Sequence, residues 1–135
     1  MQLRHVRRAR RGRKGRKVLL VGLPPLTLNA LEPPLREAAE VLSVPFPGAA
    51  FDRAAEEFDA DLVVVDVTYL DEELVRPLIT RRFLRTTPAV VFVSEGGEAW
   101  LDDLRTRQSR RLADSGVQAL VALASGSPLK LVAEQ

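Results

Sequence analysis

The sequence has no cysteine, a single histidine (His5) and no long apolar run among its 135 residues. Without thiols there can be no disulfide and no cysteine nucleophile, and one imidazole cannot build a histidine-rich zinc site. A membrane-spanning helix needs roughly 18 apolar residues, and a secretory signal needs a longer apolar segment than the one that follows the basic N-terminus. These absences remove many enzyme classes, and we expect a cytoplasmic protein.

Basic residues are concentrated at the N-terminus. Residues 1–17 hold nine of the 20 Lys and Arg residues and no acid, so residues 18–135 have 11 basic against 18 acidic residues and a net charge of −7. A run of like charge with few apolar residues cannot bury enough surface to offset the entropy of ordering. We therefore expect a disordered tail over residues 1–16 and one domain over residues 17–135, a length that suits a single hydrophobic core.

The tail is a candidate for nucleic-acid binding. Lys and Arg side chains that neutralise phosphates release condensed counterions, which gives affinity without sequence preference. The tail has no Phe, Tyr or Trp on which bases could stack, so its binding would be nonspecific. A solvated tail, a translated segment upstream of the true start and docking onto the acidic body are the other interpretations. The candidate residues are Arg7, Arg8, Arg10, Arg11 and Arg13.

Short apolar runs alternate along the chain with segments of helical spacing. A continuous apolar run bounded by Gly, Pro or Asp is typical of a strand that is buried on both faces of a parallel sheet. Five such strands, alternating with helices, predict an α/β domain. The expected strands are Val18–Val21, Val41–Phe46, Leu62–Val65, Ala89–Val93 and Val117–Leu123.

The expected helices differ in length and in the residues that interrupt them. Pro33 and Pro34 fall inside the first and should kink or restart it. The fourth is long and amphipathic and is ended by Gly116. The last opens at Ser127 and can run only about two turns before the sequence ends. The expected helices are Thr27–Leu42, Ala49–Phe58, Asp71–Leu84, Glu98–Ala113 and the segment from Ser127.

Two segments resemble the receiver domains of response regulators. Phe58–Val67 is similar to the receiver strand that ends in the phosphoacceptor aspartate, here Asp66, and Thr87–Ser94 is similar to the strand that ends in the switch residue, here Ser94. The resemblance spans about residues 17–131. It implies a flavodoxin-like, doubly wound, five-stranded parallel sheet of order 2-1-3-4-5, in this chain with a truncated last helix.

The side chains that serve the aspartate in receivers are missing. Phosphoryl transfer to a carboxylate needs a divalent cation that neutralises the developing charge. The resemblance places the acidic ligands of that cation at Gly22 and Leu23, and the receiver lysine at Leu123 or Ala124. We expect no metal or cofactor, with Mg²⁺ required only if Asp66 accepts a phosphoryl group. Otherwise Asp66 should bond the first turn of the next helix or the Ser94 hydroxyl.

The sequence therefore predicts a non-enzymatic, receiver-like signalling domain that binds a protein independently of phosphorylation. The expected partner is a signalling or motility component, or a second copy in a homodimer. Alternatives are a phosphoaccepting receiver that uses Asp66 and a nucleic-acid-associated protein that uses its tail. Gly96-Gly97 predicts a turn, because no nucleotide-binding motif surrounds it. The expected binding face, also explicable as core residues beside a solvated arginine face, is Trp100, Leu101, Leu104, Arg105 and Arg111.

Overall fold

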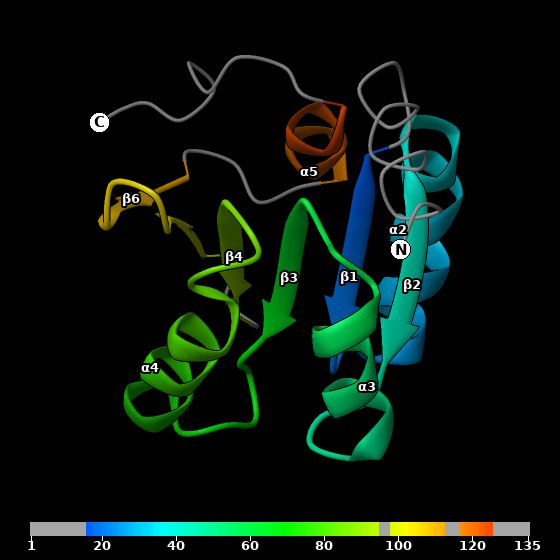
Figure 1. Cartoon of the computed structure of the whole chain (residues 1–135). Coiled ribbons are helices and arrows are strands. Elements are labelled where there is room, and N and C mark those ends of the chain that lie inside the picture. The colour runs from blue at the N-terminus through cyan, green and yellow to red at the C-terminus, as the bar shows by residue number, and fades with distance from the viewer. Residues whose placement is uncertain (1–15, 95–97, 113–116, 126–135) are drawn as a thin grey trace, which may run out of the picture.

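Four parallel strands and an antiparallel hairpin form one sheet with helices on both faces (Figure 1). The computed structural model describes residues 16–94, 98–112 and 117–125. Its strands are β1 (Lys17–Val21), β2 (Glu40–Val44), β3 (Leu62–Asp66), β4 (Ala89–Val93), β5 (Ala99–Asp103) and β6 (Gln108–Arg111). Its helices are α2 (Pro25–Ala38), α3 (Ala49–Glu57), α4 (Glu72–Phe83) and α5 (Val117–Ala124).

The central strands β1, β3 and β4 are buried on both faces. Residues 18–21, 63–65 and 90–92 have no exposed surface. Such strands carry apolar side chains at consecutive positions, because neither face can hold a polar group cheaply. The continuous runs in the sequence therefore predicted these three strands correctly, within one residue at each end.

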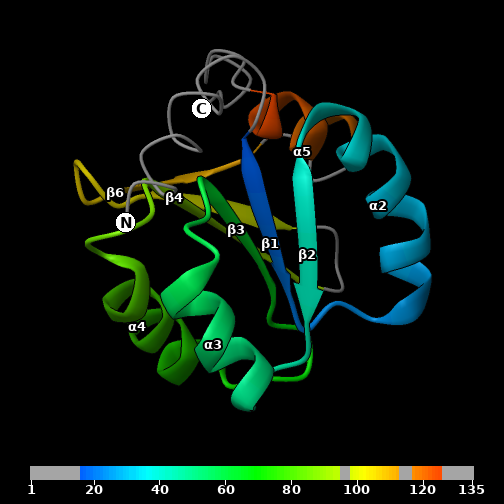
Figure 2. The same cartoon turned by 45° about the vertical axis from the view of Figure 1, so that its right-hand side comes forward.

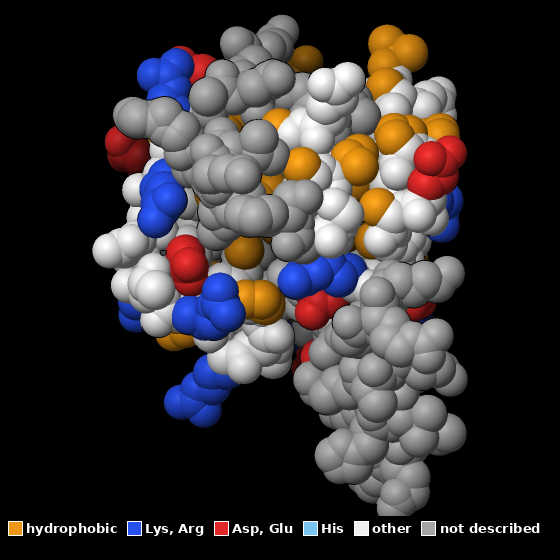
Figure 3. Space-filling model, turned by 90° about the horizontal axis from the view of Figure 1, so that it is seen from above, with side chains coloured by type: hydrophobic (Ala, Val, Ile, Leu, Met, Phe, Trp, Pro, Cys, Tyr) orange, Lys and Arg blue, Asp and Glu red, His pale blue; other side chains and the backbone are white. Residues whose placement is uncertain are grey.

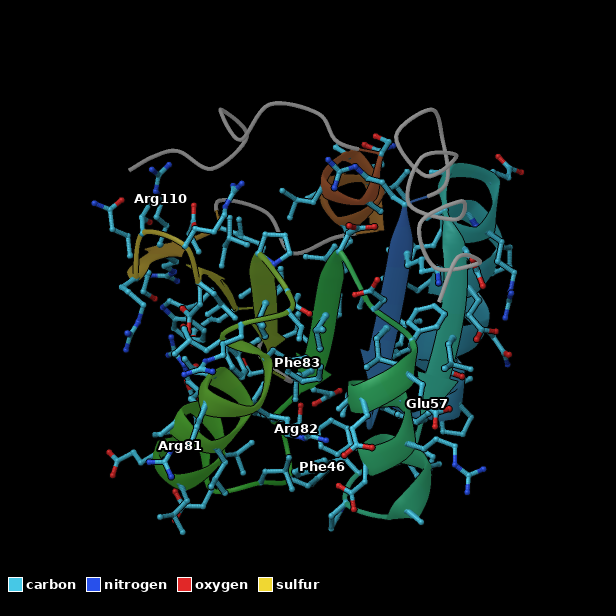
Figure 4. All side chains as sticks on the ribbon, viewed as in Figure 1. Phe46, Glu57, Arg81, Arg82, Phe83 and Arg110 are labelled. Atoms are coloured by element: carbon cyan, nitrogen blue, oxygen red, sulfur yellow. The ribbon has the colours of Figure 1, made fainter. Side chains whose placement is uncertain are left out.

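Helices cover both faces of the sheet, in the arrangement of a doubly wound fold. Leu31 and Leu35 of α2 and Leu120 of α5 pack on one face with Leu20 and Val64 of the sheet. α3 and α4 pack on the other face (Figure 2), and Phe83 lies between α4 and the sheet (Figure 4). The helices expected at Ala49–Phe58 and Asp71–Leu84 are confirmed within one residue at each end.

The strand order is 2-1-3-4-5-6, in a six-stranded mixed sheet. β2, β1, β3 and β4 are parallel, whereas β5 runs antiparallel to β4 and β6 antiparallel to β5. The expectation of a five-stranded, all-parallel sheet is therefore wrong beyond β4. The flavodoxin-like order 2-1-3-4 holds for the parallel strands.

The segment expected to be a long fourth helix, Glu98–Ala113, is instead the β5–β6 hairpin. Its apolar residues have helical spacing, but pairing with β4 lets Leu101 and Trp100 face opposite sides of the sheet. Arg107 adopts a positive φ of 63° in the turn, a conformation that asparagine or glycine signals more clearly in hairpins. No residue of this kind marked the turn in the sequence.

The segment expected to be a fifth strand, Val117–Leu123, forms α5 instead. A short apolar run fits a buried strand and a buried helix equally well. Leu120 and Leu123 pack on α2 and the sheet from one side of this helix. This packing favours the helix over the strand. Gly116 and the helix expected from Ser127 lie outside the described residues.

α2 continues through Pro33 and Pro34, so the expected restart is wrong. Proline leaves the carbonyl four residues earlier without its helical partner. Here those carbonyls belong to Asn29 and Ala30, which are exposed, so water can donate to them. The helix ends at Ala38, earlier than expected, because the Glu40 amide donates to the Arg16 carbonyl at 2.8 Å and begins β2. None of the described helices is long and apolar enough to span a membrane.

Two neighbouring residues of α4 test the packing on the face of the sheet that α3 and α4 cover. Ile79 is 1% exposed and Leu78 is 59% exposed. We expect Ile79→Ala to lower the free energy of unfolding by about 2–5 kcal/mol, because it removes core contacts and leaves a cavity. Leu78→Ala should cost less than about 1 kcal/mol. Urea denaturation measures both, and equal losses would contradict the placement of α4.

Candidate functional site

A pocket lies at the carboxyl ends of β1, β3 and β4. The chain leaves β1 toward β2 on one side, whereas β3 lies on the other side, so this is the point where strand order reverses. Open α/β sheets bind ligands at such points. The pocket has a volume of about 290 Å³. It is lined by Leu23, Pro24, Thr27, Leu31, Val64, Asp66, Thr68, Tyr69, Val93, Ser94 and Leu120.

Asp66 and Ser94 are brought together at this pocket by the register of β3 and β4. Asp66 pairs with Val93, and the Val67 amide donates to the Val93 carbonyl at 2.8 Å. Asp66 Oδ1 accepts the Thr68 amide at 2.8 Å, in the loop before α4. The Ser94 hydroxyl donates to the Glu98 carbonyl at 3.5 Å. Asp66 was expected to bond the first turn of the next helix or the Ser94 hydroxyl. Instead it accepts the Thr68 amide in the loop before α4.

The positions that match the receiver acidic pair, Gly22 and Leu23, do lie beside Asp66. A Cβ built on Gly22 would be 4.0 Å from the Asp66 carbonyl oxygen. Gly22 has a φ of +72°, which favours glycine, and the Leu23 side chain is buried against the pocket. The described residues contain no group of three or more His, Cys, Asp or Glu that could hold a metal ion. Asp66 thus lies at the carboxyl end of β3, and the two positions that the resemblance assigns to cation ligands carry no acidic side chain.

The positions that match the receiver lysine, Leu123 and Ala124, lie on α5 and are buried in the core. Among the residues described, no Lys or Arg lines the pocket. The charged surroundings that the described residues give this pocket thus consist of the Asp66 carboxylate itself.

A second cluster links α4 to the hairpin through Arg76. Its guanidinium donates to Glu72 at 3.1 Å, to Asp102 at 3.0 Å and to the Ser109 hydroxyl at 3.2 Å. The same group lies 5.0 Å from the Phe92 ring centroid and 5.7 Å from that of Trp100, within cation–π range. We call Arg76, Glu72, Phe92, Trp100, Asp102 and Ser109 the Arg76 cluster.

The residues expected to form one binding face are divided between two sides of the sheet. Leu101 and Leu104 are buried in different core clusters. Trp100 is half-buried in the Arg76 cluster, whereas Arg105 and Arg111 are exposed. A helix would have placed these residues along one face, whereas successive residues of the hairpin strands point to opposite faces of the sheet. The tail candidates Arg7, Arg8, Arg10, Arg11 and Arg13 lie outside the described residues.

Sequence reasoning missed several residues of both sites. Thr27, Thr68 and Tyr69 line the pocket from loops and a helix start, where spacing gives no signal. Arg76 had one available signal, the i,i+4 spacing from Glu72, which favours an ion pair on a helix. Its contacts with Asp102 and Ser109 depend on the hairpin, which the helical spacing of residues 98–113 does not predict.

No protein-family model matches this chain, and neither the curated proteins nor the solved structures contain a match to it. The flavodoxin-like topology of the parallel strands therefore rests on their order, β2-β1-β3-β4.

From the contacts of the Arg76 cluster we expect the Arg76 side chain to hold the hairpin against α4. Arg76→Ala should lower the free energy of unfolding by about 2 kcal/mol, because it removes charge-assisted hydrogen bonds that are partly shielded from water. Trp100 emission should shift to the red as the indole becomes more exposed. Arg81→Ala, an exposed change on the same helix, is the control. If both variants unfold at the same urea concentration, Arg76 does not fasten the hairpin.

Proposed function

We propose that this domain is a phosphorylation-independent protein-interaction module that binds an extended acidic segment of a partner along β6. The observation that carries this proposal is the outer edge of the sheet at β6, with which no further described strand pairs. All four β6 residues, Gln108–Arg111, are exposed. An extended segment that pairs with such an edge gains main-chain hydrogen bonds, and its side chains supply specificity.

The backbone of β6 has donors and acceptors on its outer side. The Leu112 amide donates inward to the Ala99 carbonyl at 2.8 Å. Backbone groups in antiparallel pairs alternate between the two sides of a strand. The amides and carbonyls of Ser109 and Arg111 therefore point away from β5, where an added strand would meet them.

The charge of the hairpin favours an acidic partner. Arg105, Arg107, Arg110 and Arg111 lie on β6 and the turn before it, and Figure 3 shows blue side chains spread among red ones over the described surface. Among the described residues, Arg107 and Arg110 make no ion pair, and Arg110 extends outward from β6 (Figure 4). Arginines on an edge strand discourage pairing between two copies by repulsion. A strand rich in Asp or Glu meets attraction at the same positions.

The Arg76 cluster prepares this edge for binding. Ser109 donates to Asp102 at 2.7 Å and accepts from Arg76, so β6 is fastened to β5 and to α4. A binding edge that is already ordered loses less conformational entropy when a partner pairs with it.

The surroundings of Asp66 support the phosphorylation-independent part of the proposal. The carboxylate already accepts the Thr68 amide, and its described neighbours include neither a cation nor further acidic ligands. The nucleic-acid alternative rests on tail residues outside the described ones and stays a prediction.

A peptide-display selection tests the strand addition. Peptides selected on the full chain should carry Asp or Glu at alternating positions, and fluorescence anisotropy should give their Kd. Ser109→Pro should weaken binding about tenfold or more, because it removes an outward amide. Ser109→Ala is the matched control, since it removes the hydroxyl and keeps the amide. Peptides that bind both variants equally would show that β6 is not the site.

Charge reversal provides a second readout with the same peptides. Arg107→Glu combined with Arg110→Glu should weaken binding about tenfold at low salt, with a smaller effect at high salt. Arg81→Glu on α4 is the control at an exposed site. Competition by a 20-nucleotide oligo(dT) that disappears when residues 1–15 are deleted would favour the nucleic-acid alternative instead.

Beryllofluoride with Mg²⁺ tests the phosphoacceptor alternative, because it mimics a phosphoryl group on aspartate. We expect no change in the Tm of the wild-type chain and the same peptide Kd with and without the reagent. A Tm increase in the wild type that is lost in Asp66→Asn would show that Asp66 is a working phosphoacceptor and would overturn the proposal.

A further inference from the structure

The pocket at the ends of β1, β3 and β4 has apolar walls around one charged group. Leu23, Leu31, Val64 and Leu120 supply apolar surface. Asp66 is the single charged residue among those described in the lining. The pocket volume of about 290 Å³ lies near the lower limit for small-molecule sites. The pocket therefore suits a compact ligand with an apolar body.

The carboxylate of Asp66 has capacity for a further donor. Oδ1 accepts the Thr68 amide at 2.8 Å, and within the described chain no other hydrogen bond or ion pair reaches this side chain. A neutral apolar ligand would strip water from a charged oxygen and leave it unpaired, which is costly. A ligand with a positively charged donor would replace that water with a charge-assisted hydrogen bond.

Anionic ligands fit this pocket poorly. No described Lys or Arg lines it, and Asp66 repels negative charge. The N-terminus of α2 lies at its rim, but Pro24 and Pro25 lack amide hydrogens, so Leu26 and Thr27 offer the remaining amides of the first turn. A helix N-terminus acts as about half of one positive charge, which is less than the full negative charge of Asp66. The balance favours a cation.

An inorganic cation is not favoured over an organic one. Mg²⁺ and Ca²⁺ are held by several oxygen ligands, whereas a single carboxylate lines the described part of the pocket. The apolar walls would add nothing to a bare ion but would bury the carbon chain of an organic amine. Four hydroxyls, on Thr27, Thr68, Tyr69 and Ser94, border the same space as further acceptors for an ammonium group.

We propose that this pocket binds a small primary amine, with its ammonium group at Asp66 and its apolar body between α2, α5 and the sheet. This site is separate from β6 and does not rest on the strand addition proposed above. The two can be tested and can fail independently.

Three ligands with the same body and different heads test the assignment: hexylamine, hexanol and hexanoate. Two-dimensional ¹H–¹⁵N NMR titration of the full chain gives the Kd and the location. We expect hexylamine to bind about tenfold more tightly than hexanol, and hexanoate to bind not at all. The amides of Thr68 and Ser94 should shift, and that of Arg53 on α3 should not. Hexylamine should also raise the Tm, because it binds the folded state.

Two variants identify the groups responsible. Asp66→Asn keeps an oxygen acceptor for the Thr68 amide and removes the charge, so it should reduce hexylamine affinity to that of hexanol and leave hexanol binding unchanged. Glu57→Gln, an exposed acid on α3, is the matched control and should bind like the wild type. Thr27→Trp at the exposed rim should block both ligands by filling the pocket.

The proposal has clear contrary outcomes. Equal affinities for hexylamine and hexanol in the wild type would overturn it, as would unchanged hexylamine binding in Asp66→Asn. Shifts confined to amides away from Thr68 and Ser94 would place any amine elsewhere and would also overturn it. None of these outcomes would affect the peptide measurements on Ser109→Pro.

Discussion

The burial of β1, β3 and β4 on both faces is the constraint on which the rest of the molecule depends. Strands with no exposed residues, such as Leu19–Val21 and Val63–Val65, need apolar cover above and below the sheet. α2 and α5 supply it on one face, and α3 and α4 on the other. Polar groups can then appear only where the strands end. Asp66 and Ser94 lie at such ends, so their position follows from the packing of the core as much as from any chemistry they perform.

The hairpin covers the edge of the parallel sheet, because β4 would be an exposed edge strand without it. β5 pairs with β4 and buries Ala99 and Leu101, and β6 then becomes the new edge with four exposed residues. The edge of the sheet is therefore formed by the polar and basic residues of β6 and not by the apolar residues of β4. Arg76 makes this arrangement specific, since it reaches from α4 to Asp102 and Ser109 on the two hairpin strands. The guanidinium presents five donors in a rigid planar fork, whereas a lysine ammonium has three donors on a flexible stem, so arginine suits several acceptors in fixed positions.

The parts of the fold that the sequence predicted correctly are those where one physical signal decided the structure. The apolar runs of β3 and β4 and the helical spacing of α3 and α4 had no strong competitor. Residues 98–124 carried conflicting signals. Trp100, Leu101 and Leu104 fit helical spacing, β6 has no apolar residue, and the turn at Arg107 has no glycine. In α5 an apolar run fits both structures, and packing against α2 chooses the helix. The pocket could be located in outline from the ends of β1, β3 and β4, but its apolar wall depends on α5 and could not.

The departure from a parallel fifth strand also changes the chemistry around Asp66. A parallel strand next to β4 would end at the same edge of the sheet and could place a lysine beside the carboxylate. Because β5 runs the other way, it meets that edge with Ala99, which is buried and pairs with Val93. Leu120 of α5 lines the same pocket as Asp66. The antiparallel hairpin therefore goes with a pocket in which α5 supplies apolar lining and Asp66 is the one charged residue among those described. The same segment creates the basic edge at β6, so both surfaces that we associate with function arise where the chain departs from the all-parallel pattern.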